Sequence, residues 1–114
     1  MKLGGKNREF KYTVNSIRHL INMTGKTPSE ILNGFDPTDF DLGVKLICCG
    51  LLWENPKLTP DMVGDWLEVD DGVYSQAITD AVNALVVSFQ RQFKIELEEV
   101  DEEKNSQKRT GKNT

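Results

Sequence analysis

The chain has 114 residues, which is enough for one modest hydrophobic core. Hydrophobic residues make up 38% of it and charged residues 28%, and the net charge is −4. No apolar run approaches the roughly 20 residues of a membrane-spanning helix, and residues 1–6 lack the apolar centre of a secretory signal. The composition therefore predicts a single intracellular domain without a membrane partner.

Charge is unevenly distributed along the chain. Residues 1–26 carry six basic residues and one acidic residue (+5), whereas residues 27–80 carry eleven acidic and two basic residues (−9). A basic segment of this kind can contact nucleic acid. We favour the interpretation that the two segments pack together and partly neutralise each other, because only Phe10-Lys11-Tyr12 interleaves basic and aromatic residues.

The N-terminal residues 2–12 predict a short β-hairpin. Gly4 and Gly5 supply the positive φ angles of a tight turn, and Phe10 and Tyr12 alternate with polar neighbours.

Two helices follow the hairpin. Thr13 or Asn15 caps the first, and Gly25 ends it. Apolar residues spaced by three and four give this helix one apolar face, formed by Val14, Ile17, Leu20 and Ile21. Residues Thr27–Glu30 form a capping box with proline at the first helical position, which predicts a second helix of one or two turns.

The most apolar part of the chain is Val44–Trp53, with eight apolar residues among ten. This predicts a buried core helix, started by Asp36-Pro-Thr-Asp39. Gly43 and Gly50 lie seven residues apart on nearly one face, where we expect the first or the last helix to approach closely.

Two more helices complete the predicted fold. Thr59, Pro60 and Asp61 start a short helix that folds back across the core helix. Residues 73–97 predict the last helix, about 40 Å long. Its apolar stripe consists of Tyr74, Ile78, Ala81, Val82, Leu85, Phe89, Phe93, Leu97 and Val100. The far end of this helix either projects toward a partner or bends back or frays.

The fold class predicted is mainly α: a helical domain of four to five helices over residues 1–100, with a short N-terminal β-hairpin. Residues 101–114 are rich in charged and polar residues, and the last eleven residues have no apolar side chain. This composition predicts a disordered C-terminal tail.

Catalytic, metal and cofactor sites are not indicated by any residue pattern. Cys48 and Cys49 are adjacent and are expected to be buried thiols, and His19 has no recognisable nucleophile partner. Three aspartates, at positions 36, 39 and 41, resemble a calcium loop, but its glycine and its glutamate are missing, so helix capping explains them better. We therefore expect a protein that is not an enzyme.

Partner binding is expected to use apolar side chains. Trp53 and Trp66 follow the apolar periodicity and are expected in the core, with one of them partly exposed at an interface. The candidate partner-binding residues are Trp53, Trp66, Phe89, Phe93 and Leu97.

The order of these elements resembles one protein family. A basic hairpin ends in Phe10-Lys-Tyr-Thr-Val-Asn-Ser-Ile-Arg-His-Leu20 and is followed by the short helix Thr27-Pro-Ser-Glu-Ile-Leu32. The segment Cys49-Gly-Leu-Leu-Trp-Glu-Asn-Pro-Lys-Leu-Thr-Pro-Asp-Met-Val-Gly-Asp-Trp-Leu67 and a long last helix complete the pattern. Over residues 2–95 the chain resembles the tail assembly chaperones of long-tailed bacteriophages and related tail-like elements.

The resemblance implies a non-enzymatic protein made in the cytoplasm of the infected host. It would coat the apolar, largely helical tape measure protein, recruit tail tube subunits, and be absent from the mature virion. No cofactor, nucleic acid or membrane is implied, and self-association stays open.

Such families often produce a second, longer product by −1 ribosomal frameshifting near the end of the gene. The chain ends in Gly111-Lys112-Asn113-Thr114, and codons for Lys112 and Asn113 can form a slippery run of adenines. We hypothesise a slip there, with Lys104-Asn105 as a less well placed alternative; an ordinary polar tail is the competing interpretation.

Two other functions stay open. One is another phage morphogenesis component, a head–tail connector or minor tail protein, which would be retained in the virion. The other is a small nucleic-acid-binding regulator that uses the basic residues 1–26 and binds more weakly as salt rises.

Overall fold

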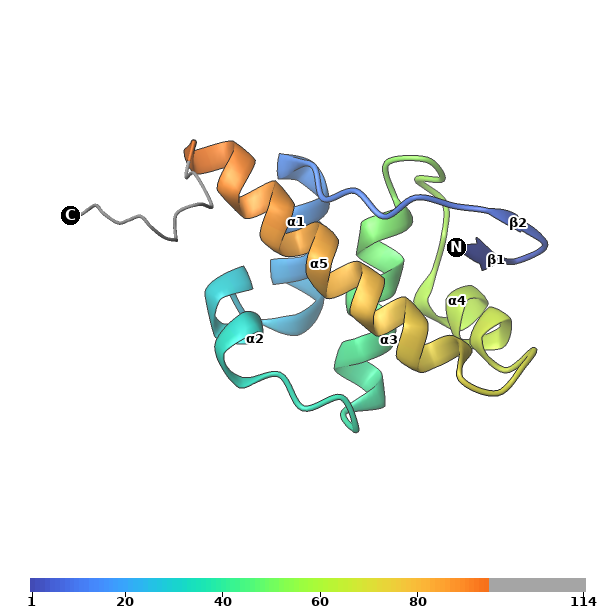
Figure 1. The fold of residues 1–114 in the computed structure, drawn as a ribbon. Coiled ribbons are helices and arrows are strands. Elements are labelled where there is room, and N and C mark those ends of the chain that lie inside the picture. The colour runs from blue at the N-terminus through green and yellow to red at the C-terminus, as the bar shows by residue number, and fades with distance from the viewer. Residues whose placement is uncertain (95–114) are drawn as a thin grey trace, which may run out of the picture.

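The computed structural model describes residues 1–94, and these form five helices and one two-stranded sheet. The predicted fold class, mainly helical with an N-terminal hairpin, is confirmed (Figure 1). The elements are β1 (Lys2–Leu3), β2 (Lys6–Asn7), α1 (Val14–Thr24), α2 (Pro28–Gly34), α3 (Phe40–Leu51), α4 (Pro60–Leu67) and α5 (Val73–Phe93). The predicted tail, residues 101–114, lies outside the described residues.

The hairpin is shorter than predicted. β1 and β2 are antiparallel, and Gly4 and Gly5 form the turn with φ of 60° and 86°. The prediction that the hairpin reaches residue 12 was wrong, because the next residues pair with a helix instead. Lys11 N–H donates to the Gly50 carbonyl (2.8 Å), and the Tyr12 hydroxyl donates to the Leu46 carbonyl (2.6 Å). Residues 8–13 therefore form an extended segment across α3.

Side-chain caps start the helices largely as predicted. Thr13 accepts from Ser16 N–H at the start of α1, and Gly25 ends that helix with φ of 70°. Thr27 and Glu30 form the complete capping box of α2, and Thr59 caps α4. These polar side chains satisfy backbone groups that the first helical turn leaves unpaired.

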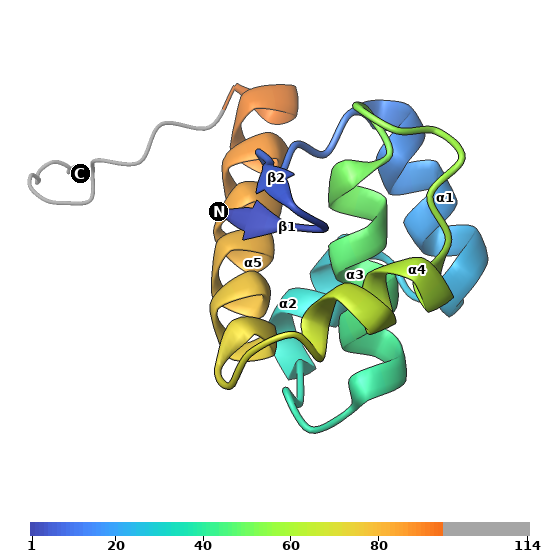
Figure 2. The ribbon, with the colours of Figure 1, turned by 90° about the vertical axis from the view of Figure 1, so that its right-hand side faces the viewer.

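Helix α3 is the centre of the fold. Viewed from the side, it lies between α5 and α1, with α4 packed across it (Figure 2). Eight of its twelve residues are buried. Its predicted start was too early: Asp39 accepts from Leu42 N–H as the N-cap, while Asp36 accepts from Thr38 in the preceding turn. It ends at Leu51, so Trp53 lies in the following turn.

The two glycines of α3 admit different neighbours. At Gly43 an added Cβ would meet the Tyr74 side chain of α5, as expected for an approaching helix. At Gly50 it would meet the rings of Phe10 and Tyr12. The close neighbour of Gly50 is therefore the extended segment, not a helix.

Helix α5 ends earlier than predicted. It runs unbroken to Phe93, and Lys94 follows in the left-handed region with φ of 55°. Leu97 lies outside the described residues. The last turns of α5 and the first turns of α1 line a common groove. Within residues 1–94, no helix is both long and apolar enough to cross a membrane.

Candidate functional site

An apolar groove lies between α1, the start of α2 and the last turns of α5. Its volume is about 260 Å³, and its exposed lining is almost wholly carbon. The lining residues are Val14, Ile17, Arg18, Pro28, Phe89, Gln92 and Phe93. We call this surface the α1–α5 groove.

The apolar stripe of α5 forms one wall of the groove. Along this stripe Ile78 and Leu85 are buried against the core. Farther on, Phe89 is half-buried and Phe93 is 65% exposed, with their ring centroids 4.9 Å apart. The stripe thus continues past the core, and its last two aromatic rings face the groove.

Helix α1 forms the opposite wall. Its predicted apolar face is divided: Leu20 is buried in the core, whereas Val14 and Ile17 line the groove. Val14, the first helical residue after the Thr13 cap, is 56% exposed. Ile21 is also exposed, outside the groove lining.

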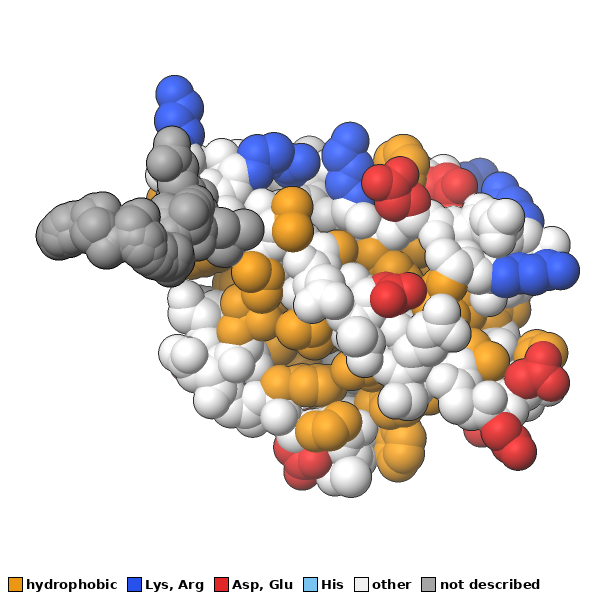
Figure 3. Space-filling view, in the orientation of Figure 1, with side chains coloured by type: hydrophobic (Ala, Val, Ile, Leu, Met, Phe, Trp, Pro, Cys, Tyr) orange, Lys and Arg blue, Asp and Glu red, His pale blue; other side chains and the backbone are white. Residues whose placement is uncertain are grey.

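One basic side chain, Arg18, lines the groove. Lys26 and Lys94 lie within two positions of a lining residue in the sequence, whereas Arg91 lines a separate hollow beside the N-terminal segment. Glu30 is the one acidic residue in these positions. The space-filling view shows apolar side chains gathered beside the end of α5 and a row of basic side chains along the adjoining edge (Figure 3).

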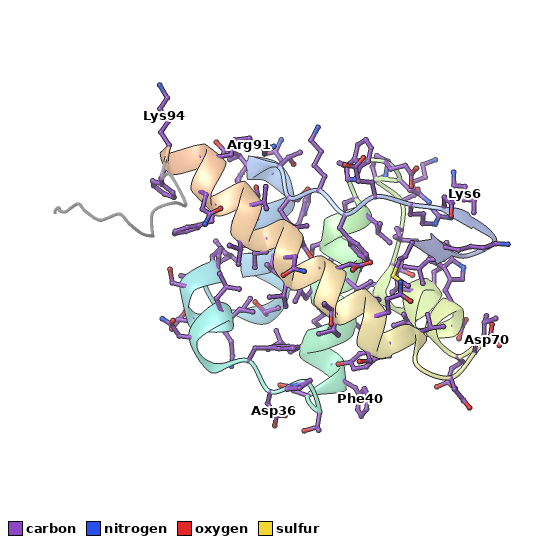
Figure 4. All side chains as sticks on the ribbon, in the orientation of Figure 1. Lys6, Asp36, Phe40, Asp70, Arg91 and Lys94 are labelled. Atoms are coloured by element: carbon purple, nitrogen blue, oxygen red, sulfur yellow. The ribbon has the colours of Figure 1, made fainter. Side chains whose placement is uncertain are left out.

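Acidic side chains are spread over the described surface (Figure 3). Figure 4 places Arg91 and Lys94 at the end of α5, Asp70 at the opposite end of the domain, and Asp36 on its lower side, near Phe40. A hollow there is lined by Phe40, Asp41, Val44, Pro60, Asp61, Gly64, Asp65 and Glu68. Four acidic residues thus line this hollow, whereas the α1–α5 groove is lined by no acidic residue of the described chain.

The predicted site residues do not form one surface. Phe89 and Phe93 meet in the groove, whereas Leu97 lies outside the described residues. Trp53 is 41% exposed in the turn after α3, and its Nε1 donates to the Glu9 carbonyl (2.8 Å). The prediction that one tryptophan is partly exposed is thus met, but its ring contacts the N-terminal segment.

Trp66 also holds the N-terminal segment. It is half-buried against Gly4, and the Arg8 guanidinium lies 4.3 Å from the centre of its ring. Arg8 also pairs with Glu54 (3.1 Å), the one ion pair between residues 1–26 and the remainder of the described chain. The predicted packing of the basic segment on the acidic body is thus confirmed at this residue.

The remaining groove residues were not singled out from the sequence. Val14 and Ile17 carried a signal, since they belong to the apolar face of α1. Pro28 and Arg18 carried none, because proline at a first helical position and arginine on a helix surface are common. Only the packing of α1 and α5 on the same central helix α3 brings them together.

The reactive groups predicted to be structural have structural partners. Cys48 and Cys49 are buried free thiols, and burial raises their pKa values to about 11 and about 12. The carboxyl of Asp36 has a lowered pKa because Thr38 donates two hydrogen bonds to it. Within residues 1–94 no three His, Cys, Asp or Glu side chains are grouped so that they could hold a metal ion.

No protein-family model, curated protein or solved structure matches this chain. The family resemblance therefore rests on the sequence pattern alone, and the α1–α5 groove rests on the geometry.

Proposed function

We propose that this protein is a tail assembly chaperone of a long-tailed bacteriophage or a related tail-like element. It binds the tape measure protein, keeps it soluble in the host cytoplasm and recruits tail tube subunits. It performs no chemical reaction and leaves before the virion is complete.

The observation that carries this proposal is the α1–α5 groove. Exposed apolar side chains at Val14 and Phe93 line one continuous depression, rather than being scattered singly. An exposed apolar depression with few polar groups is typical of a surface that accepts an amphipathic helix. A largely helical, apolar tape measure protein has segments of that kind.

The test is co-expression of the tagged chain with the tape measure protein encoded at the same locus. We expect the wild-type chain to keep the tape measure protein in the supernatant and to co-purify with it. The double variant Val14→Ser, Phe93→Ser should co-purify with at least about tenfold less tape measure protein than the wild-type chain, because two apolar anchors are removed.

The matched control is Val87→Ser. Val87 lies on the same helix and is 57% exposed, close to the 65% of Phe93, but it faces the N-terminal segment instead of the groove. This variant should retain the tape measure protein. Equal losses in both variants, or no co-purification by the wild-type chain, would contradict the proposal.

The proposal also includes a longer product made by frameshifting at Lys112 and Asn113, which lie outside the described residues. Expression of the native locus with its downstream DNA, followed by mass spectrometry, should give a minor species that shares residues 1–112 and then diverges. A gene without repeated adenines at these codons would remove this part. A virion inventory that contains the chain would favour a connector or minor tail protein instead.

A further inference from the structure

We infer that the α1–α5 groove is selective for one chemical class of helix: an amphipathic helix whose apolar face is flanked by acidic side chains. The identification of that helix with part of a tape measure protein rests on the proposed function, but the preference for acidic flanks does not.

The size and lining of the groove fit side chains of a helix better than a free small molecule. Its volume of about 260 Å³ is below the usual range of ligand pockets, roughly 300–1,000 Å³. Helices α1 and α5 and the start of α2 form the walls, and the half-buried ring of Phe89 and the exposed ring of Phe93 line one side. Such a surface accepts a few aliphatic anchors spaced by three and four residues.

The charges beside the groove select the flanks of the incoming helix. Arg18 lines the groove, is exposed and donates to the neutral Asn15 side chain (3.1 Å). Neither Arg18 nor Lys94 forms an ion pair within residues 1–94. Lys94 follows Phe93 directly and extends from the end of α5 into solvent (Figure 4). Arg18, on the groove wall, is therefore positioned to meet carboxylates on the flank of a bound helix.

The rest of the surface reinforces this selection. Eleven of the twelve acidic residues in the described residues 1–94 lie in residues 27–80, and Figure 4 places Asp70 at the end of the domain opposite Lys94. A helix with acidic flanks is therefore repelled by the far end and attracted at the groove. A helix with basic flanks is attracted by the far end and repelled at the groove.

The test uses two synthetic helical peptides of about 18 residues, or about five turns. Both carry leucine at the same positions, spaced by three and four. One has glutamate beside the leucine stripe, and the other has lysine there. Binding of each to the full chain is measured by fluorescence anisotropy at low and at high salt. We expect the glutamate peptide to bind about five- to tenfold more tightly at low salt, and the difference to shrink toward high salt.

Charge reversal assigns the preference to the groove. The variant Arg18→Glu should weaken binding of the glutamate peptide and strengthen that of the lysine peptide. Its control is Lys6→Glu, the same charge change on the exposed strand β2, which lies outside the groove. Lys6→Glu should leave the ratio of the two affinities within about twofold, since the charge is distant and screened.

Several outcomes would overturn the inference. They are binding of neither peptide, equal binding of both, or the same change in Lys6→Glu as in Arg18→Glu. Self-association that Phe93→Ser abolishes would identify a second copy as the occupant instead. The triple variant Ile95→Ser, Leu97→Ser, Val100→Ser provides a supporting outcome. Residues 95–103 contain both acidic and apolar residues and would compete with the glutamate peptide for the groove, so this variant should bind the peptide more tightly.

The peptide experiment and the co-purification experiment can fail independently of each other. If the chain discriminates between the peptides but does not co-purify with the tape measure protein, the groove chemistry stands and the partner is a different protein. If it co-purifies but does not discriminate, the proposed function stands and this inference fails.

Discussion

Residue 50 has no room for a methyl group. A Cβ added to Gly50 would lie 2.8 Å from the Phe10 ring and 2.8 Å from the Tyr12 ring, both of which are held in the core. Gly50→Ala should lower the free energy of unfolding by about 1–3 kcal/mol, because the overpacking outweighs the better helix propensity of alanine. Urea unfolding followed by tryptophan fluorescence measures this change.

Gly64→Ala is the matched control, since it adds the same methyl group to helix α4. No atom lies within 4 Å of the added Cβ there. The free energy of unfolding should stay equal or rise by up to about 1 kcal/mol. If both variants are destabilised alike, the close packing at Gly50 is not the cause.

The two buried thiols make stability depend on alkaline pH. Burial raises the pKa of Cys48 to about 11, and burial together with the neighbouring thiol raises that of Cys49 to about 12, from an ordinary value of 9.0. Below pH 9.0 both states keep these protons. Above it the unfolded chain loses them first, so the free energy of unfolding should fall until the folded thiols titrate.

The measurement for the thiols is the urea midpoint between neutral pH and about pH 10.5, a range in which the unfolded chain ionises first. We expect a decline that the double variant Cys48→Ala, Cys49→Ala reduces. The buried phenol of Tyr12, whose pKa burial also raises, leaves a residual decline in that variant. A urea midpoint that does not change with pH in the wild-type protein would contradict the assignment of the alkaline stability loss to the buried thiols.

Among the elements, the N-terminal hairpin depends on Arg8. This side chain donates to the Leu3 carbonyl (2.7 Å), pairs with Glu54 and covers the Trp66 ring. Arg8→Met should release the hairpin and lower the free energy of unfolding by about 1–3 kcal/mol, because hydrogen bonds of a mostly buried charge are lost. Hydrogen exchange of residues 1–8 is the direct measurement.

Lys6→Met provides the comparison, because Lys6 is exposed on β2. In Lys6→Met, the hydrogen-exchange rates of residues 9–94 should match those of the wild-type protein, and the backbone amides of the hairpin should stay protected. Protection of the hairpin that survives Arg8→Met would show that Trp66 and Gly4 suffice to hold it.

The sequence predicted elements best where the signal is local. Thr13, Thr27 and Thr59 cap helices through contacts within three residues, so adjacent sequence contains the whole signal. The end of α5 had no such signal. Lys94 takes a left-handed conformation that usually marks glycine or asparagine, and the apolar stripe in the sequence continues past it.

One wall of the candidate site could be predicted from the sequence, and the other could not. Phe89 and Phe93 follow from the period of one helix, which brings their rings together. The other wall depends on how α1 and α5 are both placed on α3, which no local pattern contains. For the same reason Trp53 and Trp66 were expected at a partner interface, yet the N-terminal segment contacts both of them.

At the level of the whole molecule, stability and the groove are separable. Leu85 is fully buried on α5, whereas Phe93 is 65% exposed on the same stripe. Leu85→Ala should cost about 2–5 kcal/mol of unfolding free energy. Phe93→Ser should cost under about 1 kcal/mol and yet abolish tight peptide binding. Thermal unfolding and peptide titration of both variants test this division, and a large stability loss in Phe93→Ser would contradict it.

The hydrogen bond from the Ser88 hydroxyl to the Tyr12 carbonyl joins residues 76 positions apart. During synthesis the ribosome makes the extended segment first and α5, which receives it, last. Until α5 has emerged, Tyr12 and the face of α3 that α5 covers have no complete partner. Completion of the core therefore follows the emergence of α5 from the ribosome, and a nascent chain that stalls before α5 presents an open apolar face to the cell.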